Sequence, residues 1–199
     1  MDFEASPRAR ALLAQLDAFM DRYVLPCNAA WQASVRRGVL PDFLEDLKAL
    51  AREQGLWNLC LPRLRADEPG TRLSNLDYAP LAERMGRIPW SAEVFNCSAP
   101  DSGNMELLQL HAAAGQRERW LLPLLQGRMR SAFAMFEPDV ASSDPTGLQT
   151  SVRREGGELV LNGRKWFITG AAHPQCAVLV VMCRSEGEAH EEAPHGSHS

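Results

Sequence analysis

A segment of small, acidic and aromatic residues, FAMFEPDVASSDP at 133–145, carries the side chains of this sequence best suited to chemistry. Pro138 fixes a backbone torsion, and Ala141, Ser142 and Ser143 are small enough to let a ligand approach the main chain. Such a loop offers N–H groups and two hydroxyls, which suit a phosphate or the edge of a heteroaromatic ring. These residue types are therefore compatible with a ligand-binding loop.

Aromatic and thioether side chains lead into this loop. Phe133, Met135 and Phe136 are the types that pack on a flat ring. The same residues also fit an ordinary strand followed by a turn, because Ser143-Asp144-Pro145 is common turn chemistry. On residue types alone, a plain turn is the favoured interpretation.

The order and spacing of these residues resemble the acyl-CoA dehydrogenase family. FAMFEPDVASSD is similar to the family's loop in which an aromatic residue precedes Thr-Glu-Pro and small residues ending in Ser-Asp, in the version of its larger multidomain members. LNGRKWFITG at 161–170 resembles the family's Asn-Gly-x-Lys-x-Trp-Ile-Thr segment, and 97–128 resembles the end of its helical N-terminal domain. The resemblance is strong from Asn96 to Arg184 and less specific from Asp2 to Ser91.

The resemblance implies an FAD site with assigned residues. The residues that would border the flavin and its pyrophosphate are Phe133, Ala134, Met135, Phe136, Glu137, Pro138, Ser142, Ser143, Phe167, Ile168 and Thr169. Ser142 or Ser143 would contact the FAD phosphates and a bound acyl-CoA, Phe167 would cover the flavin, and Thr169 would donate a hydrogen bond towards its reactive edge. Glu137 is assigned a structural role in the loop.

Phe136 departs from the family pattern, which usually has Thr at this position before Glu-Pro. A side-chain hydrogen bond to the flavin would be lost here, at a cost of about 1 kcal/mol. FAD would still bind through backbone contacts, with altered affinity or reactivity.

The activity that the resemblance implies is FAD-dependent α,β-desaturation of acyl-CoA thioesters, with electrons passed to an electron-transferring flavoprotein and with a homo-oligomeric assembly. The family's proton-abstracting glutamate lies in a C-terminal domain, so we expect this chain to be an N-terminal portion without a catalytic residue. Two alternatives remain open. One is a non-catalytic truncated product or helical interaction module of the same fold, and the other is an acyl-CoA oxidase-like flavoenzyme.

Helical periodicity and stop signals dominate the first two thirds of the sequence. The predicted helices run from Ser6-Pro7 to Pro26, from 29 to 36, from 43 to Gly55, from Ser74 or Asn75 to Gly86, from 89 to 98, from an Asp101 cap onwards, and from 116 to 126 with a bend at Pro123. The helix after Asp101 carries leucines on more than one side, which predicts a helix buried in a bundle. His111 on that helix is predicted to be a hydrogen-bonded core residue.

The pattern changes after Gly127 to short runs typical of strands. The predicted strands are 132–136, 151–155 and 158–161 around Gly156-Gly157, 165–169 after Asn162-Gly163, and 177–182. The fold class is therefore α+β: a helical bundle (1–127) followed by a partial antiparallel β-domain (128–184) and a disordered tail (185–199).

Composition excludes several classes of protein. The net charge of −4 argues against a nucleic-acid-binding surface, and five cysteines without a CxxC pair give no support for a metal site. No apolar run is long enough to span a bilayer, so we expect no integral membrane segment. The N-terminal residues lack the apolar core of a secretory signal, which predicts a cytoplasmic protein.

Overall fold

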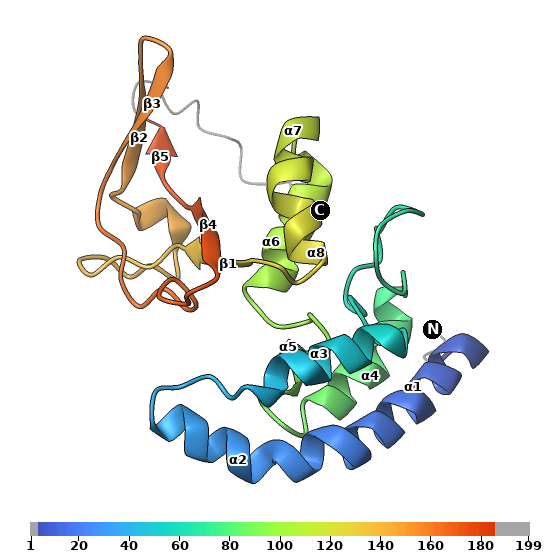
Figure 1. The fold of residues 1–199 in the computed structure, drawn as a ribbon. Helices are drawn as coiled ribbons and strands as arrows, with labels where there is room; N and C mark the ends of the chain where they lie inside the picture. Colours follow the sequence, from blue (N-terminus) through green and yellow to red (C-terminus); the bar gives the residue numbers. More distant parts are fainter. Residues whose placement is uncertain (1–3, 186–199) are drawn as a thin grey trace.

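A computed structural model describes residues 4–185 of the chain (Figure 1). The helices are α1 (Pro7–Phe19), α2 (Leu25–Arg36), α3 (Phe43–Glu53), α4 (Asn75–Met85), α5 (Ser91–Val94), α6 (Asp101–His111), α7 (Ala114–Gln116) and α8 (Leu122–Leu125). The strands are β1 (Arg130–Ala134), β2 (Ser151–Glu155), β3 (Glu158–Asn162), β4 (Cys176–Val181) and β5 (Arg184–Ser185). The predicted tail lies outside the described residues, except for Ser185.

Two predicted helix starts are confirmed by their caps. The Ser6 hydroxyl accepts a hydrogen bond from the N–H of Ala9, and Ser74 accepts one from Asp77 in the same way. Gly55 lies just beyond α3 with φ +71°, as the predicted stop requires. Local sequence signals therefore set these helix ends.

Pro26 does not end the first helix, where we predicted that it would. Pro26 was expected to end the first helix, yet the chain stays helical from Pro7 to Arg36 through a π-helical turn at Met20–Val24. A second π-helical turn, Arg117–Leu121, precedes Pro123. A π-helical turn is wider than an α-helical turn. It relieves the clash of the proline ring with the preceding turn and does not need the hydrogen bond that proline cannot donate, so each helix continues.

Three predictions about the middle helices are wrong. The predicted helix at 89–98 is only the single turn α5. α6 is not buried on all sides, because Leu107 and Leu110 are 39% and 47% exposed. His111, at the end of α6, is exposed and is not a core residue.

Two apolar cores support the helical part. α1, α3, α4 and α5 enclose a core that includes Leu16, Phe19, Leu81 and Phe95, and α6 and α8 enclose a second that includes Met105. Figure 1 shows α1 to α5 gathered at one end of the molecule, with α6 beside β1 at the start of the β part. α6 thus connects the helical part to the strands.

The strands form two small sheets, and the α+β fold class is confirmed. β2 and β3 are the predicted antiparallel hairpin around Gly156-Gly157. β1 pairs with β4 in parallel, and β2 pairs with β5 in parallel, so antiparallel pairing holds for one of the three pairs. The predicted strand at 165–169 is wrong, because this segment is irregular and crosses to the end of β1.

Candidate functional site

Glu137 organises the loop that follows β1. Its buried carboxylate accepts hydrogen bonds from the backbone N–H groups of Gln149 (2.7 Å) and Thr150 (2.9 Å) and from Nζ of Lys165 (2.8 Å). Lys165 Nζ also donates to the carbonyl of Met135 at 3.0 Å. One carboxylate therefore ties together three segments that are distant in sequence.

The pKa of Glu137 is lowered to about 2 by this environment. Removal from water opposes ionisation, but the Lys165 ammonium and the two backbone N–H groups outweigh that effect. Glu137 is consequently a carboxylate whose hydrogen-bonding capacity is taken up by the protein. This geometry agrees with the structural role predicted for it.

The two candidate serines occupy different environments. Ser142 is buried, and its hydroxyl accepts a 2.7 Å hydrogen bond from the N–H of Glu137 and lies 3.2 Å from the carbonyl of Val140. Ser143 is exposed. The geometry assigns Ser142 to the shape of the loop and leaves Ser143 facing solvent.

Three aromatic side chains are exposed beside this loop, and we call them the aromatic surface: Phe136, Trp166 and Phe167. Their exposed fractions are 48%, 44% and 83%, and the ring centroids of Trp166 and Phe167 lie 4.6 Å apart. The N–H of Trp166 donates to the carbonyl of Phe136 at 3.1 Å, which joins the irregular segment to the end of β1. Large apolar side chains gathered at the surface make this region a candidate binding surface.

Phe167 also has an unusual backbone conformation, with φ +49°. A bulky residue rarely adopts this left-handed region, and such strain clusters at functional sites. Thr169, two residues further on, is exposed, and Ile168 between them is half-buried.

The remaining candidate residues lie along and after β1. Ala134 is buried, and Phe133, Met135 and Pro138 are half-buried. All eleven candidates thus belong to two chain segments, 133–143 and 167–169, which meet through Phe136 and Trp166. The structure thus joins the two segments by a backbone hydrogen bond, and their role in binding FAD stays a prediction.

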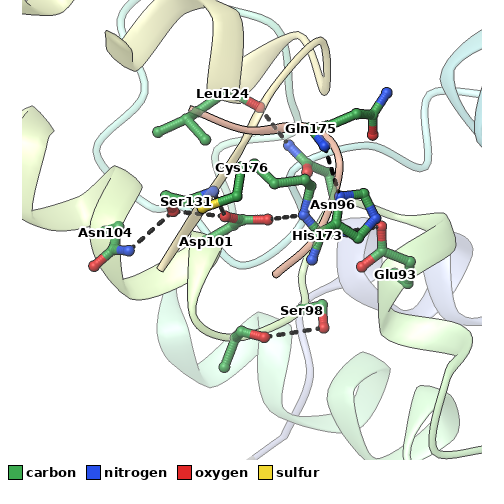
Figure 2. Close-up of polar contacts among 12 residues, drawn as sticks. Glu93, Asn96, Ser98, Asp101, Asn104, Leu124, Ser131, His173, Gln175 and Cys176 are labelled. Atoms are coloured by element: carbon green, nitrogen blue, oxygen red, sulfur yellow. Dashed lines mark hydrogen bonds and ion pairs between the residues drawn. The ribbon is translucent and has the colours of Figure 1, made fainter. Parts of the chain in front are cut away.

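A buried charge cluster that the sequence did not reveal holds β1 against the helices (Figure 2). Arg130, at the start of β1, forms ion pairs with Glu93 of α5 and Asp101 of α6. Lys48 of α3, itself 4% exposed, forms a second ion pair with Glu93 at 2.8 Å. Two cations therefore face two carboxylates at the junction between the helices and the strand.

The cluster continues into neutral side chains. Asp101 accepts hydrogen bonds from the N–H (2.7 Å) and the hydroxyl (2.6 Å) of Ser131, and Asn104 donates to the same hydroxyl at 2.9 Å. Asp101 was predicted to cap α6, and this is wrong: it is the first residue of that helix, and its carboxylate binds β1. Burial alone would raise the pKa of Glu93, but the charges of Arg130 and Lys48 lower it.

One sequence signal could have located the cluster. Lys48 lies on the same helical face as Leu44 and Ala51, which are buried. A lysine at such a position needs a buried acidic partner. The sequence does not show that this partner comes from α5.

The fold defines a class of protein: a helical bundle joined through β1 to a loop with a buried acid and an exposed aromatic surface. The sequence model of the acyl-CoA dehydrogenase N-terminal domain matches residues 6–128, and that of the middle domain matches 132–199. The chain therefore belongs to the acyl-CoA dehydrogenase family.

Particular relatives fall in the same family. Acyl-CoA dehydrogenase family member 10 of Mus musculus is 44% identical over 92% of this chain and 18% of its own length. A Mycobacterium tuberculosis protein named as an acyl-CoA dehydrogenase, FadE2, is 43% identical over 95% of this chain and 46% of its own. A solved acyl-CoA dehydrogenase homologue from Mycobacterium abscessus is 46% identical with a TM-score of 0.86, covering 94% of this chain and 48% of that one. The chain spans half or less of the length of these relatives.

One comparison concerns a ligand, and the helices of this chain show whether a membrane span is present. A solved acyl-CoA dehydrogenase from Bacillus anthracis is complexed with FAD. It is 25% identical with a TM-score of 0.66, and the match covers 93% of this chain and 30% of the Bacillus anthracis chain. Among residues 4–185, no helix is long and apolar enough to cross a membrane.

Proposed function

We propose that this chain forms the N-terminal and middle parts of an FAD-dependent acyl-CoA dehydrogenase, with the helical part at 1–127 and the β part at 128–184. The observation that carries the proposal is the exposed aromatic surface of Phe136, Trp166 and Phe167 beside a rigidly bonded loop. FAD in this class supplies an acceptor for a hydride from the β-carbon of an acyl thioester. The relatives' family and the FAD in the Bacillus anthracis structure support the assignment.

The residues present fit a flat heteroaromatic ligand. Phe167 offers an apolar face whose burial under a ring would contribute roughly 0.5–1.5 kcal/mol beyond area burial. Ser143 and Thr169 are exposed, and we propose that their hydroxyls donate to phosphate oxygens and to the ring edge. Ser142 and Glu137 form hydrogen bonds within the protein that hold the loop in shape, and we assign them no contact with the ligand.

Glu137 is not proposed as the proton-abstracting base. Its carboxylate already accepts three hydrogen bonds, and its pKa of about 2 makes it a weak base. We propose instead that Glu137 holds Lys165, and with it Trp166 and Phe167, in position. Acyl-CoA as substrate, an electron-transferring flavoprotein as acceptor and a homo-oligomer as assembly complete the proposal.

A flavin titration tests this function. Wild-type protein should quench the fluorescence of added FAD with saturation, and Phe167→Ala should weaken binding several-fold. Leu159→Ala is the matched control, because Leu159 is an equally apolar, 66% exposed side chain on the distant hairpin strand β3. Absence of FAD uptake by the wild-type chain would favour the non-catalytic alternative.

Substrate reduction tests the reaction separately. The flavin-loaded protein, mixed anaerobically with a series of acyl-CoA esters, should lose its visible flavin absorbance if desaturation proceeds. Rapid recovery of the absorbance in air would favour the oxidase alternative. Stable flavin binding without bleaching by any ester would contradict dehydrogenase activity in this chain.

A further inference from the structure

A cavity of about 260 Å³ opens in the helical part, where the end of α3 and the loop after it meet the end of α8. None of its lining residues belongs to the segments 133–143 and 167–169, which carry the candidate flavin residues. The cavity is therefore separate in its residues from the candidate flavin site. The residues that line it are Arg52, Gly55, Trp57, Pro69, Gly70 and Gln126.

Hydrogen bonds fix the walls of this cavity. The indole N–H of Trp57 donates to the carbonyl of Leu125 at 2.8 Å, which sets the orientation of the ring. The buried Asn58 donates through Nδ2 to the carbonyls of Pro69 at 2.7 Å and Leu125 at 2.9 Å, so one amide group ties the loop at Pro69 to the end of α8. The walls are thus held in place by the protein itself, which lowers the entropic cost of binding a ligand.

Two glycines let the walls come close together. Gly70 has φ +141°, and a Cβ there would lie 2.8 Å from the Cβ of Asn58. Gly127, just beyond α8, has φ +63°, and its Cβ would lie 2.9 Å from Nη2 of Arg52 and 2.8 Å from Cζ2 of Trp57. A larger residue at either position would displace groups that form the cavity. The shape of the cavity therefore depends on glycine at both positions.

Arg52 brings a positive charge without an acidic partner to the cavity. Its guanidinium carbon lies over the Trp57 ring, 4.2 Å from the centroid. Among residues 4–185, Arg52 forms no ion pair, and its side chain is exposed. The contact with the indole uses the flat face of the guanidinium, so the N–H groups at its edge remain available as donors.

Gln126 adds a neutral donor to the same cavity. Its Oε1 accepts a 2.7 Å hydrogen bond from Nε of Arg128, and its Nε2 has no protein acceptor in the described part of the chain. The other side chains of the lining, Trp57 and Pro69, are largely apolar, and no acidic side chain lines the cavity among residues 4–185. The cavity therefore combines a cation and an amide donor with an apolar wall.

We propose that this cavity binds a small organic carboxylate with an apolar body. The carboxylate accepts hydrogen bonds from the edge of the Arg52 guanidinium and from Nε2 of Gln126, and the apolar body packs against Trp57 and Pro69. A guanidinium suits a carboxylate because its paired N–H groups match the two oxygens. The volume lies below the roughly 300–1,000 Å³ of pockets for drug-sized ligands, so the ligand is small. An inorganic anion would satisfy the donors but leave the apolar wall uncovered.

An NMR titration tests the proposal on the full chain, independently of flavin binding. Sodium benzoate is added at constant ionic strength to isotope-labelled protein, and the indole N–H signal of Trp57 reports from inside the cavity. We expect this signal to shift with saturation. Benzamide has the same shape without the charge, and sodium sulfate has the charge without an apolar body, so each should bind at least roughly tenfold more weakly. Reference signals in the same spectrum come from Trp31, Trp90, Trp120 and Trp166.

Variants locate the donors. Arg52→Ala should weaken benzoate binding at least roughly tenfold, because a charge-assisted hydrogen bond is lost, and Gln126→Ala should weaken it several-fold. Arg52→Lys keeps the charge without the planar fork and should bind with intermediate affinity. Arg119→Ala is the matched control and should bind like the wild type. Arg119 is also exposed and lies over a tryptophan ring, 5.6 Å from the centroid of Trp120, but it does not line this cavity.

Four results would overturn the proposal. The first is a Trp57 signal that does not shift with saturation when benzoate is added. The second is benzamide binding as tight as benzoate binding, because the charge would then be irrelevant. The third is an Arg52→Ala variant that binds benzoate as tightly as Arg119→Ala. The fourth is a benzoate-induced shift confined to Trp166, which would place the ligand on the aromatic surface.

Discussion

Replacement of Glu137 by glutamine tests how strongly one carboxylate holds the candidate site together. Glutamine has nearly the same shape but offers a single acceptor oxygen and no charge. At least two of the three hydrogen bonds to the Gln149 and Thr150 N–H groups and to Lys165 would be lost or weakened. Since hydrogen bonds to charged groups contribute about 1.5–3 kcal/mol each, we expect local stability to fall by roughly 2–3 kcal/mol.

Amide hydrogen exchange at Gln149 and Thr150 measures this loss directly, because these N–H groups donate to Glu137. A loss of 2–3 kcal/mol corresponds to exchange that is roughly 30- to 150-fold faster. The matched control is Asp139→Asn, the same change of acid to amide two residues away. Among residues 4–185, the one ion pair of Asp139 is an exposed one with Arg164 (3.2 Å), so its removal should change stability by less than about 1 kcal/mol.

The pH dependence of the stability difference between wild type and Glu137→Gln tests the role of the Glu137 charge. The pKa of Glu137 in the folded protein, about 2, lies below its ordinary value of 4.5, so the ionised form favours the folded state. The gap between wild type and Glu137→Gln should be complete above pH 4.5 and should close as the pH falls from 4.5 to 2. Equal exchange rates in the two variants, or a gap that stays constant over that pH range, would refute the role given to Glu137.

Three further predictions concern the junction, a tight turn and the ligand. Arg130→Met should lower the free energy of unfolding by about 3 kcal/mol because it leaves the buried Asp101 without its cation and Glu93 with Lys48 alone, while the exposed Arg128→Met should have little effect; urea unfolding compares them. Gly127→Ala should cost more than about 1 kcal/mol, because φ is +63° and the new Cβ would lie 2.8 Å from an indole carbon, whereas Gly115→Ala in α7 meets open space; thermal unfolding shows whether the two differ. Phe136→Thr should tighten FAD binding about fivefold by restoring a hydrogen bond of about 1 kcal/mol, and an unchanged dissociation constant would remove Phe136 from the flavin face.

Local signals in the sequence predicted the parts of the fold that depend on neighbouring residues. Ser6 and Ser74 set helix starts, and Gly156-Gly157 set the hairpin, because capping and turn formation involve only a few adjacent residues. Pro26 misled for a related reason. A proline was expected to end a helix, and no local pattern indicates the π-helical turn that accommodates it.

The candidate site was predicted as a set of residues but not as an arrangement. The resemblance placed Phe136, Ser142 and Phe167 near one another, whereas residue types alone did not distinguish the buried Ser142 from the exposed Ser143. The segment at 165–169 looked like a strand from its β-branched and aromatic composition. Its real path is set by long-range bonds from Lys165 to Glu137 and from Trp166 to Phe136, which no local pattern encodes.

The position of the aromatic surface relative to the helices follows from the charge cluster at the other end of β1. Asp101 binds both Arg130 and Ser131, so it fixes the first two residues of the strand that ends two residues before Phe136. A β-strand transmits position along its length because its backbone is extended and paired, here with β4. Changes at Asp101 should therefore displace the aromatic surface as a unit and weaken flavin binding without contacting the ligand. The helical part therefore sets the geometry of a site whose candidate residues all lie in the β part, at 133–143 and 167–169.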